Sequence, residues 1–228
     1  MNRLLAFFSV RDGRSENVAE EVTLEAQRLA SAGQGVEATV LVAETQDPVT
    51  SLYRMRGYEV VLALRAPSAT AASGMASAVG ELASRVDAAI HRDLSAALVA
   101  EENRVVPEVS PGSRYMALMR RKAGTTHEEY VDYYRTKHAR FGIECPGALG
   151  YHQNYVIPDL SQQASVACGF GVFSVDSVTE IFISSAQAFN EATEKNPIRE
   201  EAAIDEVRFI DRGSMVGFCL GLKAQFGS

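Results

Sequence analysis

Three side chains suited to acid–base chemistry recur at four-residue spacing near the middle of the chain. They are Tyr130, Tyr134 and His138. In an α-helix, residues four and eight positions apart lie on one face, so two phenol hydroxyls and one imidazole would point the same way. An imidazole can exchange a proton near neutral pH, and a phenol can donate a hydrogen bond to a developing oxyanion. The spacing favours a proton-transfer site, with ordinary core packing as the alternative.

The helix that carries these residues has a recognisable start. Thr126 is followed by a Glu three positions later, which is the capping-box spacing, and the helix is expected to run to about Phe141. Its apolar face should pack on a sheet. We therefore expect His138 and Tyr134 to be catalytic and Tyr130 to contact substrate in a cavity between sheet and helices. If these residues are core, His138 is simply a helix-end histidine that the helix dipole stabilises.

A second histidine lies on the strand predicted over residues 150–157. His152 and Asn154 share one face of that strand, and Tyr151 and Gln153 share the other. The sequence does not say which face meets the helices. We expect His152 to be a third catalytic residue and Tyr151 and Asn154 to bind substrate, with a space-filling or solvated His152 as the alternative.

An acidic residue interrupts an apolar strand further along. Glu180 lies on the same face as Phe182 in the strand predicted over residues 178–183. A carboxylate in such surroundings has a raised pKa unless it is paired. We expect both residues to bind substrate. The alternative for Glu180 is a salt bridge to an arginine, for which the candidates are Arg120, Arg121 and Arg208.

The elements that must position these residues follow the same order twice. Apolar runs predict strands over residues 4–10, 36–42, 58–66, 114–121, 150–157, 178–183 and 214–222. Helical periodicity predicts helices over residues 15–32, from about 75 to about 100, 126–141, 184–194 and 197–206. This is the split βαβ, or ferredoxin-like, order in each half. The expected fold class is α+β, with antiparallel sheets.

A tandem duplication would explain the length of 228 residues. Segments 95–106 and 201–210 each run from small apolar residues through acids and an Arg to an apolar pair, just before a predicted strand. Two generic helix ends would give the same pattern. We expect one degenerate ferredoxin-like unit over residues 1–110 and a second over residues 113–228.

The second unit resembles the EthD family. Five motifs carry the resemblance in the family's order, and the first half shows none of them. They are Arg114–Tyr130, the Tyr130/Tyr134/His138-Ala139 pattern, Pro146-Gly147 with Gly150–Asn154, Val175–Phe182, and Asp205–Asp211. The resemblance implies the dimeric α/β-barrel superfamily, whose barrel is normally built from two subunits. Two units in one chain imply a barrel closed internally, with a homodimer as the expected assembly.

The resemblance also implies a class of chemistry. We expect a cofactor-independent lyase or isomerase (dehydratase, decarboxylase, cyclase or isomerase) acting on a small, apolar, oxygenated molecule of aromatic, polyketide or catabolic origin. His138 would be the base, and Tyr134 or His152 would hold the oxyanion. The alternatives are a non-catalytic ligand-binding or accessory protein, a cofactor-free monooxygenase, or a haem protein with His138 as axial ligand.

Composition and spacing exclude several other classes. A net charge of −7 argues against a nucleic-acid surface. No apolar run reaches the roughly 18 residues of a membrane span, and three widely separated cysteines suggest reduced thiols, so a cytoplasmic protein is expected. The sequence contains no phosphate-binding or dinucleotide motif, and its histidines lack metal-binding spacing. We therefore expect neither a metal nor a cofactor.

Overall fold

The chain forms an α+β structure around one closed barrel of antiparallel strands. The structure is a computed structural model, and it describes residues 1–227 apart from 33–34, 46, 49–56 and 110–111. Around the barrel the strands follow the order β1-β3-β2-β8-β5-β7-β6-β4. The predicted fold class, two ferredoxin-like units in tandem, is confirmed. The predicted unit boundary at residue 110 lies outside the described residues.

The first half supplies four strands and most of the helices on one side of the barrel. Its elements are β1 (Asn2–Phe8), α1 (Ser15–Ala32), β2 (Glu37–Ala43), β3 (Val60–Ala66), α2 (Ala69–Gly74), α3 (Ala76–Arg85), the 3₁₀ turns η2 (Asp87–Ala89) and η3 (Arg92–Leu94), and β4 (Ala96–Val106).

The second half repeats the order with additional helices. Its elements are β5 (Ser113–Met119), α4 (His127–Tyr133), the π-helical segment η4 (Tyr134–His138), α5 (Ala139–Ile143), β6 (Gly150–Val156), α6 (Pro158–Cys168), β7 (Ser177–Ile183), α7 (Ala186–Glu194), α8 (Pro197–Phe209), the 3₁₀ turn η5 (Arg212–Ser214) and β8 (Val216–Phe226).

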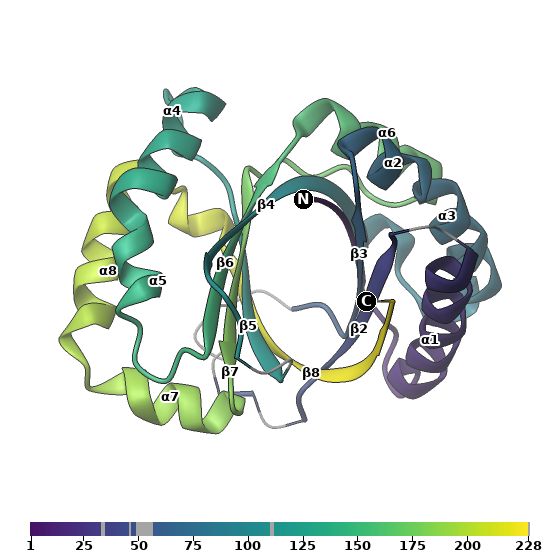
Figure 1. Cartoon of the computed structure of the whole chain (residues 1–228), viewed down its shortest axis with the longest axis horizontal. Helices are drawn as coiled ribbons and strands as arrows, with labels where there is room; N and C mark the ends of the chain where they lie inside the picture. The colour runs from purple at the N-terminus through teal and green to yellow at the C-terminus, as the bar shows by residue number, and fades with distance from the viewer. Residues whose placement is uncertain (33–34, 46, 49–56, 110–111, 228) are drawn as a thin grey trace.

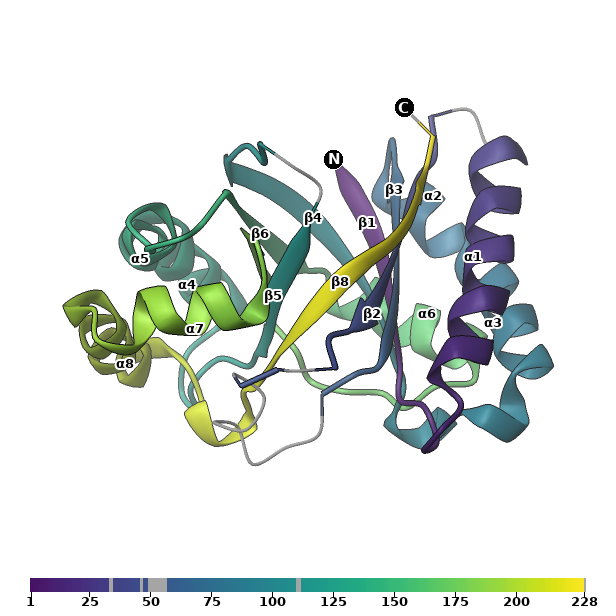
Figure 2. The same ribbon diagram turned by 90° about the horizontal axis from the view of Figure 1, so that it is seen from below.

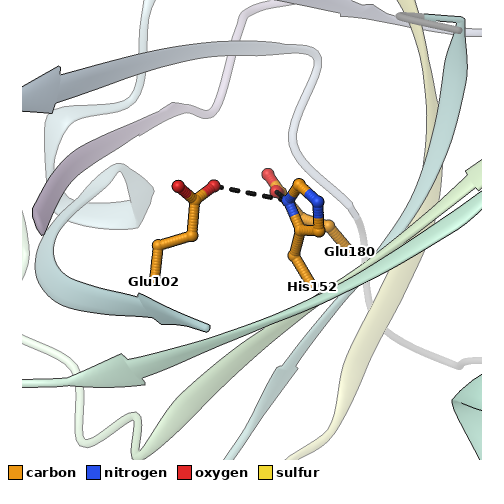
Figure 3. Close-up of side chains that lie close together, drawn as sticks. All are labelled: Glu102, His152 and Glu180. Carbon is orange, nitrogen blue, oxygen red and sulfur yellow. Dashed lines mark ion pairs between the residues drawn. The ribbon is translucent and has the colours of Figure 1, made fainter. Parts of the chain in front are cut away.

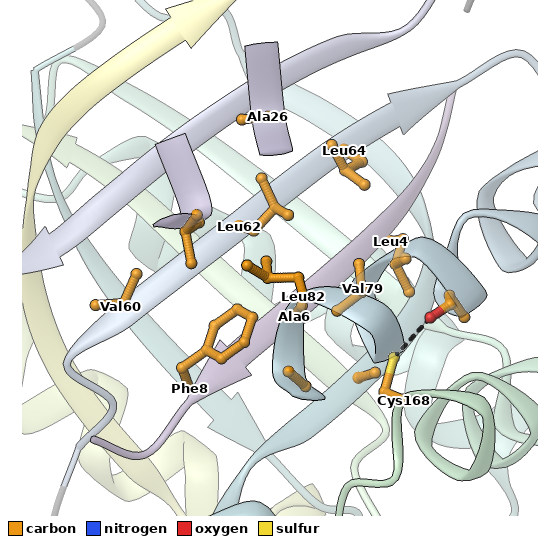
Figure 4. Close-up of a cluster of buried hydrophobic side chains, with 14 of the residues drawn as sticks. Leu4, Ala6, Phe8, Ala26, Val60, Leu62, Leu64, Val79, Leu82 and Cys168 are labelled. Atoms are coloured by element: carbon orange, nitrogen blue, oxygen red, sulfur yellow. Dashed lines mark hydrogen bonds between the residues drawn. The ribbon is translucent and has the colours of Figure 1, made fainter. Parts of the chain in front are cut away.

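Alternation along the strands divides the buried side chains into three groups. One set lies inside the barrel, and one lies under the helices on each side of it. Helices α1, α2, α3 and α6 cover one side, and α4, α5, α7 and α8 cover the other (Figures 1 and 2). Phe8, Leu62 and Leu82 belong to the cluster under the first group of helices (Figure 4). Each strand therefore presents one face to helices and the other to the barrel interior.

The predicted helix up to about residue 100 is wrong in its second part. Helix α3 ends at Arg85, and Ala96–Val106 is strand β4, which pairs with β1 and β6. Small residues such as Ala96 and Ala97 have good helix propensity, but here one faces the barrel and the other faces the helices. Burial on both faces within the sheet outweighs the local preference.

Helix α6 was not predicted from the sequence. It supplies hydrogen bonds to the part of β4 that β6 does not reach. Strand β6 pairs with β4 only from Ala100 onward. The hydroxyls of Ser161 and Ser165 fill the gap, because each accepts from a backbone N–H of β4 and donates to the carbonyl of the same residue, Val99 or Ala97 respectively. Serines therefore satisfy backbone groups that a neighbouring strand would otherwise pair.

The internal repeat is real in its element order, but not where the local pattern placed it. Segment 95–106 is mostly strand β4, whereas 201–210 is mostly helix α8, so those two segments do not correspond. The matching parts are Ile90, η3 and β4 in the first half and Ile210, η5 and β8 in the second. Both isoleucines form isolated antiparallel bridges, to Val10 and Arg121 respectively.

Cys145, Cys168 and Cys219 form no disulfide with one another. Among the described residues, no helix has both the length and the apolar character needed to cross a membrane.

The contact between α3 and α6 gives a first prediction. A methyl group at Gly80 would lie 2.4 Å from the carbonyl oxygen of Ala167, whereas one at Gly74 would meet nothing within 4 Å. We expect Gly80→Ala to lower the free energy of unfolding by about 1–3 kcal/mol through overpacking. The control Gly74→Ala should be neutral or raise it by up to about 1 kcal/mol through helix propensity. Urea denaturation measures both. Equal stabilisation by the two variants would show that α6 does not pack on α3.

Candidate active site

The helix with the three chemically suited residues is interrupted by a π-helical segment. Thr126 and Glu129 form the predicted capping box, α4 begins at His127, and residues 134–138 then adopt the wider π-helical turn. Gln153 supports this irregularity, because its side-chain amide donates to the backbone carbonyl of Tyr134 at 3.0 Å. Segments of π-helix are rare and are frequent at functional sites. This one ends at His138.

The two tyrosines of the helix are fully buried and bonded to the sheet. The hydroxyl of Tyr130 lies 2.6 Å from the Ser177 hydroxyl, and that of Tyr134 lies 2.6 Å from the Thr179 hydroxyl. Burial raises the pKa of both phenols well above the usual range, so both stay protonated. Neither tyrosine lines the adjacent cavity. They fix the helix on β7 rather than presenting their hydroxyls to a ligand.

His138 differs from the tyrosines because it lines a cavity and has an acidic partner. Its Nδ1 lies 2.9 Å from Oδ2 of Asp205 on α8, and the Tyr133 hydroxyl donates to the other oxygen of that carboxylate. Burial lowers the pKa of His138, although the bond to Asp205 acts in the opposite direction. The imidazole is therefore neutral near pH 7. With its Nδ1 proton directed at the carboxylate, Nε2 carries the lone pair that can accept a proton.

The cavity lies between the outer face of the sheet and helices α5, α7 and α8, and its volume is about 160 Å³. Its wall is mostly apolar, with a few polar groups. The lining includes Tyr115, Ala117, Met119, His138, Phe141, Cys145, Tyr151, Thr179, Ile181, Phe189, Asn190, Arg199, Ala202, Glu206 and Met215. An apolar pocket with a small number of polar groups is typical of small-molecule sites.

A second titratable group, Glu206, lines the same cavity. Burial raises the pKa of Glu206 to about 7, although the nearby Arg212 opposes the shift. Nε of Arg212 lies 3.2 Å from the Glu206 carboxylate. The site therefore combines a neutral histidine with a carboxyl group that can exist in either protonation state near neutral pH.

Strand β6 divides its predicted site residues between two compartments. Tyr151 and Gln153 face the helices, and Tyr151 lines the cavity. His152 and Asn154 face the barrel interior and are fully buried. His138 and His152 therefore lie on opposite faces of the sheet and cannot act on the same atom.

Strand β7 makes the same division. Thr179 faces the cavity, whereas Glu180 and Phe182 point into the barrel. Glu180 is paired, but not with the arginines considered from the sequence. Oε2 of Glu180 accepts from Arg3 at 2.6 Å, and Oε1 lies 3.5 Å from Arg114. These contacts outweigh burial and lower the pKa of Glu180 to about 2.

The barrel interior brings together three groups that could hold a metal ion, which are Glu102, His152 and Glu180 (Figure 3). However, Nη1 of Arg3 donates to Glu102 Oε1 and to Glu180 Oε2, and these oxygens also face the imidazole. A guanidinium thus already supplies the positive charge that a metal ion would bring. A divalent ion would have to displace Arg3, so the residues present do not fit a resident metal.

Sequence reasoning overlooked the residues that complete the cavity site. Asp205 and Glu206 were noted only as part of a family motif. In the barrel interior, Arg3 was likewise not considered as a partner of Glu180. Adjacent acids near the end of a helix are common on solvated surfaces. Only the packing of α8 against η4 makes Asp205 a partner of His138.

Comparison with known protein families finds one match within the chain. Residues 122–213 match the EthD domain. The matched segment lies within the second half of the chain. It includes η4, β6, β7 and α8, and so it holds both His138 and Asp205. No curated protein matches the chain by sequence.

Solved structures resemble the whole chain in fold. An anthrone oxidase-like protein has a TM-score of 0.60 at 11% identity, covering 98% of this chain and 91% of its own. A mutant chlorite dismutase from Candidatus Nitrospira defluvii has a TM-score of 0.55 at 12% identity, covering 98% and 90%. A dye-decolorizing peroxidase from Bacteroides thetaiotaomicron VPI-5482 has a TM-score of 0.54 at 8% identity, covering 97% and 92%. At these identities the likeness concerns the fold.

The His138–Asp205 pair gives the second prediction. Asp205→Asn removes the charge that raises the imidazole pKa, so the His138 pKa should fall further below 6.5. Histidine-selective NMR titration measures this shift. Because the native imidazole binds its proton more weakly than the unfolded chain does, wild-type stability should fall as the pH drops below about 6.5. An unchanged or higher His138 pKa in Asp205→Asn would contradict the pairing.

Proposed function

We propose that the cavity beside His138 binds a small oxygenated ring compound and that the protein catalyses proton transfer on it, in a lyase or isomerase reaction. The observation that carries this proposal is the neutral, carboxylate-paired imidazole in the wall of a mostly apolar cavity. The EthD domain and the barrel fold support a small-molecule enzyme more broadly.

The cavity volume limits the size of the substrate. About 160 Å³ is close to the roughly 150 Å³ of an engineered apolar cavity that binds benzene. A single ring with one or two oxygen substituents matches this volume, whereas a fused polycyclic molecule would extend beyond the cavity. Asn190 and Arg199 in the cavity lining offer hydrogen-bond donors for the oxygens.

The proposed chemistry uses the two titratable groups in the wall. Nε2 of His138 accepts a proton from a carbon next to a carbonyl or from a phenol, and Asp205 stabilises the imidazolium that forms. Protonated Glu206 can donate a different proton to another atom of the substrate, since its pKa lies near 7. Proton exchange with solvent then restores both groups. Burial raises the pKa of Cys145 to about 11, so its thiol stays protonated and is a poor nucleophile.

If the protein bound haem, His138 would be the iron ligand, but the site does not fit a haem group. A haem macrocycle is far larger than a cavity of about 160 Å³. The imidazole Nδ1 has the carboxylate partner that a ligating histidine often has, but the cavity that His138 lines is too small to enclose the macrocycle.

Cofactor-free oxygenation remains a second candidate, because a similar fold occurs in an anthrone oxidase-like protein. It would begin with the same deprotonation of the substrate, after which molecular oxygen would be the co-reactant. A non-catalytic binding protein would use the same cavity without proton transfer.

Proton abstraction can be tested before the natural substrate is known. In D₂O the protein should catalyse exchange of the hydrogens next to the carbonyl of cyclohexanone or acetophenone for deuterium. The loss of these ¹H NMR signals over time measures the exchange rate. His138→Ala should reduce the exchange rate by about 10²–10⁴-fold, the usual contribution of a positioned general base. His91→Ala, a histidine outside the cavity lining, serves as the control. Binding of the ketones, seen as a thermal shift, without any exchange would favour the binding-protein reading and defeat the catalytic one.

A further inference from the structure

Four buried side-chain nitrogens among the described residues lack a hydrogen-bond partner, and all belong to side chains inside the barrel. They are Nε of Arg3, Nε of Arg114 and both ring nitrogens of His152. These three side chains are almost fully buried. Buried polar groups without partners are uncommon in folded proteins, and each one calls for an explanation. Because all four nitrogens lie in the barrel interior, one common explanation is expected for them.

The histidine and the arginines differ in their surroundings. Nε2 of His152 lies 2.9 Å from Glu108 and Nδ1 lies 3.3 Å from Glu102, so both ring nitrogens have acidic neighbours even though the bond geometry is poor. Nε of Arg3 and Nε of Arg114 have no hydrogen-bond partner in the part of the chain that the structure describes. The unmet hydrogen-bonding capacity therefore belongs mainly to the guanidinium groups.

Arg114 uses only a small part of its guanidinium. Its Nη1 lies 3.5 Å from Glu180, and its plane sits over the Phe182 ring at 4.6 Å from the ring centre. Neither Nε nor Nη2 donates to any residue that the structure describes. Nε and Nη2 form the edge of the guanidinium that can make two parallel bonds to a carboxylate.

Among the buried groups around Arg114, guanidiniums outnumber carboxylates, whereas the partly exposed Arg104, Glu37 and Glu108 add charges of both signs at the rim. Three buried guanidiniums, those of Arg3, Arg65 and Arg114, share two fully buried carboxylates, Glu102 and Glu180. The acidic side chains that add to the balance, Glu37 and Glu108, are about a quarter exposed at the rim. Arg114 shares its single carboxylate with Arg3, which binds that carboxylate more closely.

We propose that the barrel interior is a binding site for a small carboxylate-type anion of the size of formate, acetate or bicarbonate, held in a bidentate manner by the Nε–Nη2 edge of Arg114. Met116, on the same face of β5, and Leu220, which pairs with Arg114 on β8, are fully buried and apolar, which favours a small ion over a larger ligand. This site lies across the sheet from the cavity beside His138. It does not depend on the reaction proposed there.

Formate serves as the probe. At constant ionic strength, sodium formate should raise the Tm of the wild-type protein in a saturable way, and the ¹³C signal of labelled formate should broaden on binding. Arg114→Gln should abolish both effects. Arg114→Lys keeps the charge but loses the Nε–Nη2 edge that makes two parallel hydrogen bonds, so binding should weaken by about tenfold or more. The control is Arg140→Gln, because Arg140 also lies over a phenylalanine ring but is exposed.

Circular dichroism checks that each variant is folded, and if Arg114→Gln does not fold, the Arg114→Lys comparison decides. A wild-type protein without a saturable formate response would overturn the proposal. So would equal formate binding in wild type and Arg114→Lys, which would place the ion elsewhere. Saturable stabilisation by Zn²⁺ or Mn²⁺ that is lost in His152→Ala, without a formate response, would replace the anion site with a metal site.

Discussion

The buried guanidinium of Arg3 is the contact on which the arrangement of this barrel depends. Its Nη1 donates to Glu102 on β4, to Asn154 on β6 and to Glu180 on β7. One side chain from the first strand thus ties the first half of the chain to two strands of the second. Removing one partner of a buried pair typically costs about 3–5 kcal/mol, because the other charge is left uncompensated. The barrel interior is therefore held together by charge as well as by apolar packing.

This network decides which polar residues are available for chemistry. Along β6 and β7, alternate residues belong either to the barrel or to the helix side of the sheet. His152 and Glu180 are engaged by the interior charges, whereas Tyr151 and Thr179 border the cavity that His138 lines. A register shift of one residue would exchange the two sets. The fold therefore separates a charged interior from a mostly apolar outer cavity.

Local patterns in the sequence predicted the elements whose signals are short-range. The capping box at Thr126, the common face of Tyr130, Tyr134 and His138, and the alternation on β6 all derive from nearby residues. Together with the family motifs, they were enough for the fold class and for the helix that carries His138.

Features set by distant contacts could not be predicted in the same way. Strand β4 begins with helix-favouring alanines and becomes a strand only because β1 and β6 flank it. The serines of α6 have a role only beside β4. Asp205 is 67 positions from His138, and Arg3 is 177 positions from Glu180, so no local signal marks either pair.

The two faces of the sheet can be told apart by one titration. Phenol, a single ring with one oxygen, is added to the protein while the ring resonances of its histidines are followed by ¹H–¹⁵N NMR. If chemistry belongs to the outer cavity, the His138 signals should shift in a saturable way, while those of His152 stay unchanged behind the sheet. Saturable shifts at His152 with none at His138 would contradict the account and move the ligand site into the barrel.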